Sequence, residues 1–343
     1  MTPLFELQGV TKTFARPEDA VARLRARLAG QPAARRVTVL HETDLAVAPG
    51  EVLGLVGESG CGKSTLGRVA AGLHAPDTGR RLWDGADVAA MPPAQERATA
   101  LGIQMIFQDP HASLNPRRRV GDAIGEAAGV HGLLEGASQA DFAAELLRQV
   151  GLDPAMADRF PHQFSGGQRA RIGIARALAV QPRFLVCDES VAALDVSVQA
   201  QVLNLFMDLR ERKGLTYLFI SHDLSVVHHL ADRVAVMYLG RLVEVAPTAE
   251  LFREPAHPYT RALLDSVPRL DAGNTVFQPL KGEIASPLAP PSGCAFHPRC
   301  PHAMAVCREQ QPALQPVAAG RFAACHLVPA CGTVPSTDSQ SAP

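Results

Sequence analysis

A glycine-rich segment near residue 60 has the residue types and spacing of a phosphate-binding loop. It reads Gly57-Glu58-Ser59-Gly60-Cys61-Gly62-Lys63-Ser64, followed by Thr65. This string fits G-x-x-x-x-G-K-[ST] and stands between an apolar strand and a helical pattern. Glycines let the backbone approach phosphates, and N–H groups at a helix N-terminus favour an anion. We expect Lys63 to reach the β- and γ-phosphates of a nucleotide and Ser64 to ligate magnesium. The alternative, a chance glycine-rich turn, does not explain the flanking strand and helix.

Two carboxylates follow a second apolar strand, at residues 184–187. Asp188 and Glu189 would lie at the carboxyl edge of a parallel sheet, where open α/β sheets bind their ligands. Asp188 is suited to hold magnesium through water, and Glu189 is suited to polarise an attacking water as a general base. The alternative is an ordinary acidic turn after a strand.

A short serine and glycine string opens a helical segment between these two sites. It consists of Ser165, Gly166, Gly167 and Gln168, preceded by Phe164. The string resembles the LSGGQ signature of ABC proteins, matched at four of five positions, and implies an ATP-binding cassette. Cassettes of that family pair head to tail. By this resemblance, Ser165 and Gly167 contact the γ-phosphate held by a partner subunit, through donors at a helix N-terminus.

The other motifs of the ABC family follow in order along the chain. By resemblance, Gln108 senses magnesium and couples to membrane subunits, Asp195 belongs to the D-loop, and His222 contacts the γ-phosphate. Phe14 lies near the position of the aromatic residue that stacks on adenine, and the alternative is a core Phe at a strand end. The site as a whole implies ATP and Mg²⁺ as its ligands. The residues expected to hold the ion are Ser64, Gln108 and Asp188.

Three positions depart from the family pattern. Ser190 stands where Pro is usual, Ala192 where this subfamily usually has Ser, and Phe164 where the signature usually begins with Leu. None of the three removes a group that binds phosphate or magnesium or activates water, so we expect real hydrolysis. The expected catalytic residues are Glu189, His222, Lys63 and Gln108.

A parallel sheet is needed to position these motifs. Short apolar runs recur at residues 53–56, 105–107, 184–187, 217–220 and 234–237. Several precede helical patterns, and this alternation predicts an α/β fold with a sheet covered on both faces. It agrees with the P-loop NTPase fold of an ABC cassette. We expect a nucleotide-binding domain at 1–250 with a helical subdomain at about 109–180, and a helix at about 17–30.

The chain changes character after Pro247, where prolines become frequent. The segment His257-Pro258-Tyr259-Thr260 and the segment from Gly293 to Pro301 resemble the C-terminal extension of oligopeptide and dipeptide importer ATPases. We expect this extension at 251–330 and a disordered tail at 331–343. The cassette also looks more like the F-type subunit of that family than like its D-type partner.

Four cysteines of the extension have donor atoms suited to a metal: Cys294, Cys300, Cys307 and Cys325. Their spacing lacks the paired C-x-x-C of common zinc modules. Four thiolates suit a [4Fe–4S] cluster, and members of this importer family resemble that arrangement. Structural zinc is one alternative, with help from His297, His302 or His326. Reduced or disulfide-bonded cysteines without metal are the other.

Charge and hydropathy restrict where the chain works. Its 33 Lys and Arg residues balance 34 Asp and Glu residues, so no nucleic-acid partner is expected. No apolar run approaches the roughly 18 to 20 residues that cross a bilayer. The first residues lack the pattern of an export signal. We therefore expect a peripheral subunit at the cytoplasmic face of the bacterial inner membrane.

These features predict the ATP-hydrolysing subunit that energises a membrane importer of di- or oligopeptides. The same cassette would serve a nickel, glutathione, opine or antimicrobial-peptide importer, because other subunits select the cargo. A soluble ABC ATPase acting on nucleic acid is the remote alternative. The implied partners are a second cassette, either a paralogue or a second copy, two transmembrane permease subunits and, indirectly, a periplasmic substrate-binding protein.

Overall fold

The computed structural model describes residues 2–15, 36–109, 114–266, 285–286 and 288–329. The expected helix at about 17–30 and the expected disordered tail at 331–343 lie outside these ranges.

The main sheet has eight strands in the order β11-β12-β10-β9-β3-β8-β7-β6. Their bounds are β3 (Val52–Val56), β6 (Ile103–Ile106), β7 (Phe184–Asp188), β8 (Thr216–Ile220), β9 (Arg233–Tyr238), β10 (Arg241–Pro247), β11 (Gln315–Ala318) and β12 (Arg321–Ala323). The five strands that the sequence predicts form its parallel part, from β9 to β6. The α/β prediction is confirmed, and three antiparallel strands extend the sheet at one side.

A second sheet has four antiparallel strands in the order β2-β1-β4-β5. Their bounds are β1 (Phe5–Ala15), β2 (Arg36–Val47), β4 (Thr78–Trp83) and β5 (Ala86–Asp87). No pattern in the sequence predicts this sheet. Its side chains share one buried cluster with one face of the main sheet, where Phe5 stacks on Phe184 with the ring centroids 4.9 Å apart.

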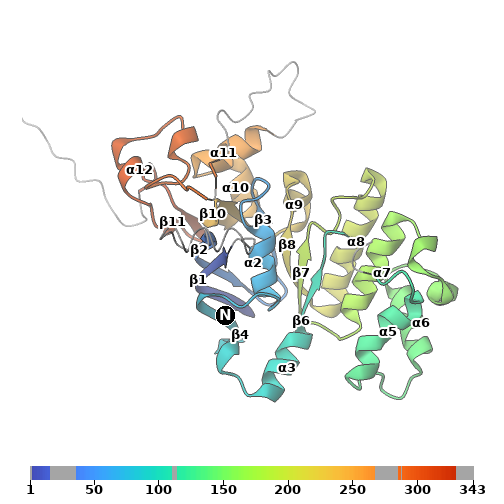
Figure 1. Cartoon of the computed structure of the whole chain (residues 1–343). Coiled ribbons are helices and arrows are strands. Elements are labelled where there is room, and N and C mark those ends of the chain that lie inside the picture. Colours follow the sequence, from blue (N-terminus) through green and yellow to red (C-terminus); the bar gives the residue numbers. More distant parts are fainter. Residues whose placement is uncertain (1, 16–35, 110–113, 267–284, 287, 330–343) are drawn as a thin grey trace, which may run out of the picture.

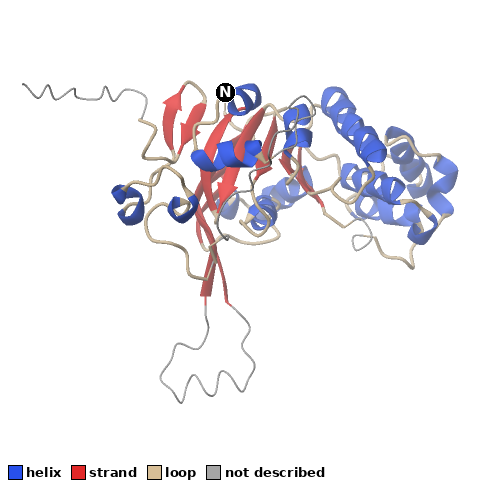
Figure 2. Cartoon of the chain, turned by 90° about the horizontal axis from the view of Figure 1, so that it is seen from above, coloured by secondary structure: helices blue, strands red, loops and turns tan. Residues whose placement is uncertain are grey.

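The helices cover the sheet and extend beyond it. Their bounds are α2 (Lys63–Ala70), α3 (Pro93–Gly102), α5 (Val120–Val130), α6 (Gln139–Gln149), α7 (Gly166–Leu178), α8 (Val196–Lys213), α9 (Leu224–Leu230), α10 (Thr248–Arg253), α11 (Pro258–Asp265) and α12 (Ala305–Glu309). Single 3₁₀ turns are η1 (Val88–Ala90), η2 (Pro154–Asp158), η3 (Pro161–Gln163) and η4 (His297–Arg299). Helices α5, α6 and α7 form an arm beyond the β6 edge of the sheet (Figure 1; Figure 2).

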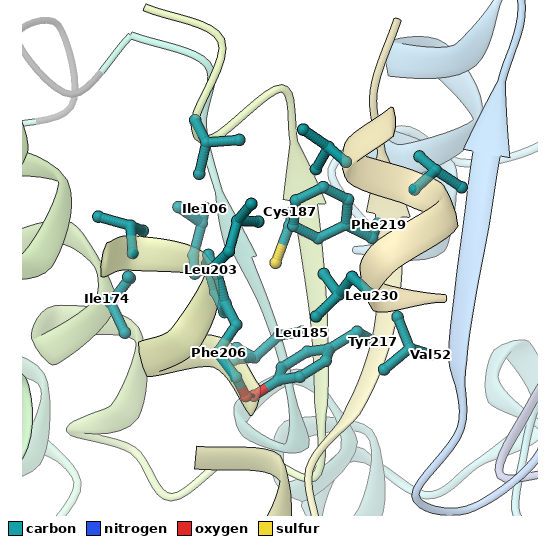
Figure 3. Packing of buried hydrophobic residues seen from close by; sticks show 14 of the residues in the cluster. Val52, Ile106, Ile174, Leu185, Cys187, Leu203, Phe206, Tyr217, Phe219 and Leu230 are labelled. Carbon is teal, nitrogen blue, oxygen red and sulfur yellow. Dashed lines mark hydrogen bonds between the residues drawn. The ribbon is translucent and has the colours of Figure 1, made fainter. Parts of the chain in front are cut away.

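Side chains on the two faces of the parallel strands pack into two separate buried clusters, because successive residues of a strand point to opposite faces. On β7, Leu185 and Cys187 face one cluster, whereas Phe184 and Val186 face the other. Figure 3 shows the first cluster, in which Phe206 of α8 packs beside the strand residues. The sheet is therefore buried on both sides, which holds its carboxyl edge in a fixed shape.

The C-terminal extension is continuous with the main sheet. Strand β12 pairs with β10, with Glu244 opposite Ala323, and β11 pairs with β12. Glu244 is 1% exposed, and its carboxylate accepts hydrogen bonds from the N–H groups of Ala256 and His257. The extension thus lies on the side of the sheet opposite the helical arm (Figure 1).

Phe206 and Met207 offer a matched test of this packing, because they are neighbours on α8 with 0% and 42% exposure. We expect Phe206→Ala to lower the free energy of unfolding by about 3–5 kcal/mol, through lost burial and the cavity left behind. Met207→Ala should change it by less than about 0.5 kcal/mol. Urea unfolding of the two variants checks the difference, and equal losses would contradict the assignment of the core.

Candidate functional site

The glycine-rich loop joins β3 to α2 at the carboxyl edge of the sheet. Gly57 has φ +153°, and a Cβ there would collide with the carbonyl oxygen of Met237. Gly62 precedes the first turn of α2 with φ +111°. Both positions therefore need glycine, and the loop leaves the N-terminal N–H groups of α2 available to an anion.

Lys63 is buried within this loop. It is 4% exposed, and its ammonium group donates hydrogen bonds to the carbonyl oxygens of Gly57, at 2.7 Å, and Glu58, at 3.0 Å. The charge is thus held inside the loop that the sequence assigns to phosphate.

Ser64 and Asp188, the two predicted magnesium ligands from separate segments, lie side by side. The hydroxyl of Ser64 donates to the carboxylate of Asp188 over 2.9 Å. Asp188 ends β7 and is 3% exposed, and this burial raises the pKa of its carboxyl group. A buried carboxylate beside a hydroxyl is an oxygen donor set that suits Mg²⁺.

Glu189 lies beside two other predicted catalytic groups, Gln108 and His222. Its carboxylate accepts a 2.7 Å hydrogen bond from the side-chain amide of Gln108 and lies 3.4 Å from Nδ1 of His222. Glu189 has φ +47°, a conformation uncommon outside glycine, and its N–H donates to the carbonyl of Ile220. Strained backbone of this kind is found at functional sites. The fold therefore joins residues 108, 189 and 222 at one carboxylate.

The signature string lies at the exposed N-terminus of α7, in the helical arm. Ser165 and Gln168 form a capping box, each side chain accepting from the other's backbone N–H. Ser165 and Gly166 are exposed, whereas Gly167 is buried against Val198, where a Cβ would collide. The N-terminus of α7 is therefore accessible to solvent at Ser165 and Gly166.

Asp195 and Phe14 are the remaining predicted nucleotide-site residues. Asp195 is exposed at the N-terminus of α8, followed by Val196, which is 85% exposed. Phe14 is partly exposed near the end of β1. Its ring meets His74 edge-on at 5.4 Å between centroids, and the Lys12 ammonium lies 5.6 Å from its centroid. Phe14 is thus outside the buried core.

The four predicted cysteine ligands line one small cavity with a largely apolar wall. They are Cys294, Cys300, Cys307 and Cys325, and the wall includes His257, Phe296, His297, His302 and His326. All four cysteines are free thiols, and burial raises the pKa of three of them. Across the described residues, no group of three His, Cys, Asp or Glu side chains has the arrangement of a metal site. The donors are gathered in one place but not arranged as a coordination shell.

Two contacts between the extension and the glycine-rich loop are not predicted from the sequence. The hydroxyl of Tyr259 accepts a hydrogen bond from the N–H of Glu58 over 2.9 Å. The guanidinium of Arg299 forms two hydrogen bonds with the Glu58 carboxylate. Arg299 lies 241 positions from Glu58, so spacing gives no signal of this pair. Both residues do fall inside the two strings that carry the importer resemblance.

Two protein families match this chain. Residues 40–192 match the family "ABC transporter", and residues 243–307 match "Oligopeptide/dipeptide transporter, C-terminal region". A probable peptide ABC transporter ATP-binding protein of Sinorhizobium fredii is 50% identical over 292 residues, which cover 85% of this chain and 83% of that protein. The chain belongs to the ABC transporter ATPase family.

Further relatives agree with that assignment. The oligopeptide transport ATP-binding protein AppF of Bacillus subtilis is 49% identical over 295 residues, covering 85% of this chain and 90% of that protein. A dimeric structure of the ATP-binding cassette MJ0796 with bound ADP and Pi superposes with a TM-score of 0.60 at 25% identity, over 71% of this chain and 98% of that one.

Family membership makes this chain an ATP-binding, ATP-hydrolysing subunit coupled to transport, with ATP and Mg²⁺ as the ligands of its nucleotide site. Within the described part of the chain, no helix is long and apolar enough to cross a membrane.

The geometry around Glu189 yields a direct test. We expect Glu189→Gln to keep nucleotide binding and to lower ATP turnover about 10²- to 10⁴-fold, because the amide keeps the shape but loses the basicity. Glu211→Gln, at an exposed position of α8, serves as the control and should retain turnover. Steady-state phosphate release measures both variants, and wild-type turnover in Glu189→Gln would refute the general-base role.

Proposed function

We propose that this chain hydrolyses ATP to energise a bacterial importer of di- or oligopeptides, as a peripheral subunit at the cytoplasmic face of the inner membrane. The observation that carries the hydrolytic part is the meeting of Gln108 and His222 at the carboxylate of Glu189. The peptide cargo is supported by the C-terminal family match and by the names of the relatives.

Each polar group at the sheet edge has a role in this proposal. The glycine-rich loop, residues 57–65, binds the phosphates through its N–H groups, and Lys63 neutralises the β- and γ-phosphates. Ser64, Asp188 and Gln108 would hold Mg²⁺, and the bound ion would offset the charge of the phosphates. Glu189 takes a proton from the attacking water, and His222 donates a hydrogen bond to the γ-phosphate.

The second half of each nucleotide site comes from another cassette. The N-terminus of α7 is exposed with its capping box formed, so the N–H groups around Gly166 and Gly167 are placed to receive a γ-phosphate held by a partner. The related cassette MJ0796 forms a dimer. Asp195 and the exposed Val196 belong to the same interface in this proposal.

Permease subunits would dock near Gln108 and the arm helices α5 and α6. Gln108 precedes the arm in the sequence and donates a hydrogen bond to Glu189, so a movement of docked permeases that shifts Gln108 would change the position of the general base. A periplasmic binding protein supplies the cargo indirectly. Phe14 would stack on the adenine, since its ring is partly exposed near the end of β1, where it meets His74 edge-on.

The cysteine cavity fits a metal group in kind and number of donors. Four free thiols surround one apolar cavity, which is a set suited to a [4Fe–4S] cluster, with zinc as the alternative. Their side chains would have to close on the group, because the described residues show no ready metal arrangement. A bound cluster would supply structural cross-linking of the extension or electron exchange.

ATP turnover tests the proposed function. We expect phosphate release to rise when the chain is co-expressed with its permeases and a second cassette, and Lys63→Ala to abolish it. Arg212→Ala, at an exposed end of α8, is the control and should retain turnover. Turnover that needs nucleic acid, and that ignores permeases, would contradict the transport role.

Metal analysis tests the cavity. We expect iron with an equal amount of inorganic sulfide in protein purified without oxygen, and loss of both when Cys300 and Cys307 are replaced by Ser. Cys187→Ser, at a buried core position, is the control, and it should leave the metal content unchanged. Zinc without iron would establish the alternative, and the absence of both metals would remove the metal proposal.

A further inference from the structure

Every polar group of Glu58, in the glycine-rich loop, has a fixed partner. Its carbonyl accepts from Lys63 at 3.0 Å, and its N–H donates to the hydroxyl of Tyr259 at 2.9 Å. Its carboxylate receives two N–H groups of Arg299, at 2.7 and 2.9 Å. Two of these partners, Tyr259 and Arg299, come from the C-terminal extension, so the shape of the loop depends on a segment remote in sequence.

The ion pair between Arg299 and Glu58 is largely enclosed by its surroundings. The side chain of Arg299 is 4% exposed and that of Glu58 is 19% exposed. The guanidinium lies 5.9 Å from the centroid of the Tyr238 ring and donates to its hydroxyl at 3.4 Å. The Glu58 carboxylate raises the pKa of Arg299, so the guanidinium is charged at every working pH. Two parallel hydrogen bonds between fixed planar groups also set the orientation of Glu58.

A carboxylate in this loop needs such a partner. The loop binds phosphates, and a negative charge within it repels them, weakly screened because the pair is sheltered from solvent. The two hydrogen bonds of Arg299 neutralise Glu58 and turn its carboxylate toward the extension. The buried hydroxyl of Tyr259 meanwhile holds the Glu58 amide.

We propose that Arg299 and Tyr259 are positioning residues of the nucleotide site, which act through Glu58 on the affinity of the loop for ATP. Neither touches phosphate, magnesium or water in this scheme. Arg299 is also the residue before Cys300, and Tyr259 packs on Phe296 at 5.3 Å between ring centroids. Cys300 and Phe296 line the cysteine cavity. The two residues that contact the loop are therefore attached to, or packed on, the wall of that cavity.

The inference rests on the proposed phosphate site, and the variants are chosen to separate the two. Arg299→Met removes the charge but keeps an unbranched apolar side chain. Arg299→Lys keeps the charge but lacks the planar guanidinium that makes two parallel hydrogen bonds. Tyr259→Phe removes one hydroxyl. Arg321→Met is the matched control. Arg321 is a largely buried arginine of the same extension, but its partners are Glu250 and Glu254 rather than the loop.

The measurement is the Kd of a fluorescent ATP analogue with Mg²⁺ on the full chain, together with KM and kcat of the assembled transporter. We expect Arg299→Met to raise Kd and KM about tenfold at nearly unchanged kcat, because the loop regains an unpaired carboxylate. Arg299→Lys and Tyr259→Phe should raise Kd about two- to threefold. Arg321→Met should stay within twofold of the unchanged chain, even where its melting temperature falls as far as that of Arg299→Met.

A double variant tests whether repulsion by the Glu58 carboxylate causes the loss of affinity. Glu58→Gln combined with Arg299→Met removes the repelling charge and should recover most of the lost affinity. No recovery, or an equal loss of affinity in Arg321→Met, would show that the extension acts only through folding and would overturn the proposal. Wild-type Kd in Arg299→Met would overturn it as well. Failure of the unchanged chain to bind Mg²⁺-ATP would instead refute the proposed function, and this inference with it.

Discussion

The register of the parallel strands is the constraint on which the nucleotide site depends. Leu55 of β3 and Asp188 of β7 both pair with Ile220 of β8, on its two sides. On the far side of β7, Ile106 of β6 pairs with Cys187. The segments that follow these strands therefore leave the sheet at one level, which places Gln108, Asp188, Glu189 and His222 beside the phosphate loop. A shift of one residue would turn every buried side chain to the opposite face, so the two packed clusters prevent it.

Three carboxylates lie close together at the carboxyl edge of the sheet, and each needs a neutral or positive partner to limit their mutual repulsion. Asp188 and Glu189 adjoin the loop that receives a triphosphate, and Glu58 lies inside the loop. Each is held by a neutral or positive partner: Ser64 for Asp188, Gln108 for Glu189 and Arg299 for Glu58. The first two partners come from the cassette and the third from the extension, so the extension contacts the glycine-rich loop as well as forming the cysteine cavity.

The helical arm and the extension occupy opposite sides of the sheet and contribute in different ways (Figure 1). The arm carries an exposed helix N-terminus, whereas the extension contacts the glycine-rich loop of the same chain. His257 explains how the extension reaches the loop. It is 1% exposed, caps α11 by accepting from the N–H of Tyr259, and burial lowers its pKa to about 4, so it stays neutral. The cap fixes the first turn of α11, and Tyr259 then points at Glu58.

Local sequence determined the glycine-rich loop, the five parallel strands and the helix of the signature, because each depends on backbone conformation or short-range periodicity. The motifs also supplied the candidate catalytic groups, which stay predictions. The antiparallel sheet was not foreseen, since β1 and β2 are long strands interrupted by irregular register. Tertiary structure alone decided which groups meet: the bond between Gln108 and Glu189, the gathering of four cysteines at one cavity, and the pair between Arg299 and Glu58. Gln108 and Glu189 are 81 positions apart in the sequence, and Arg299 and Glu58 are 241 positions apart. Only the packing of the whole sheet brings such distant segments together, and no local pattern records it.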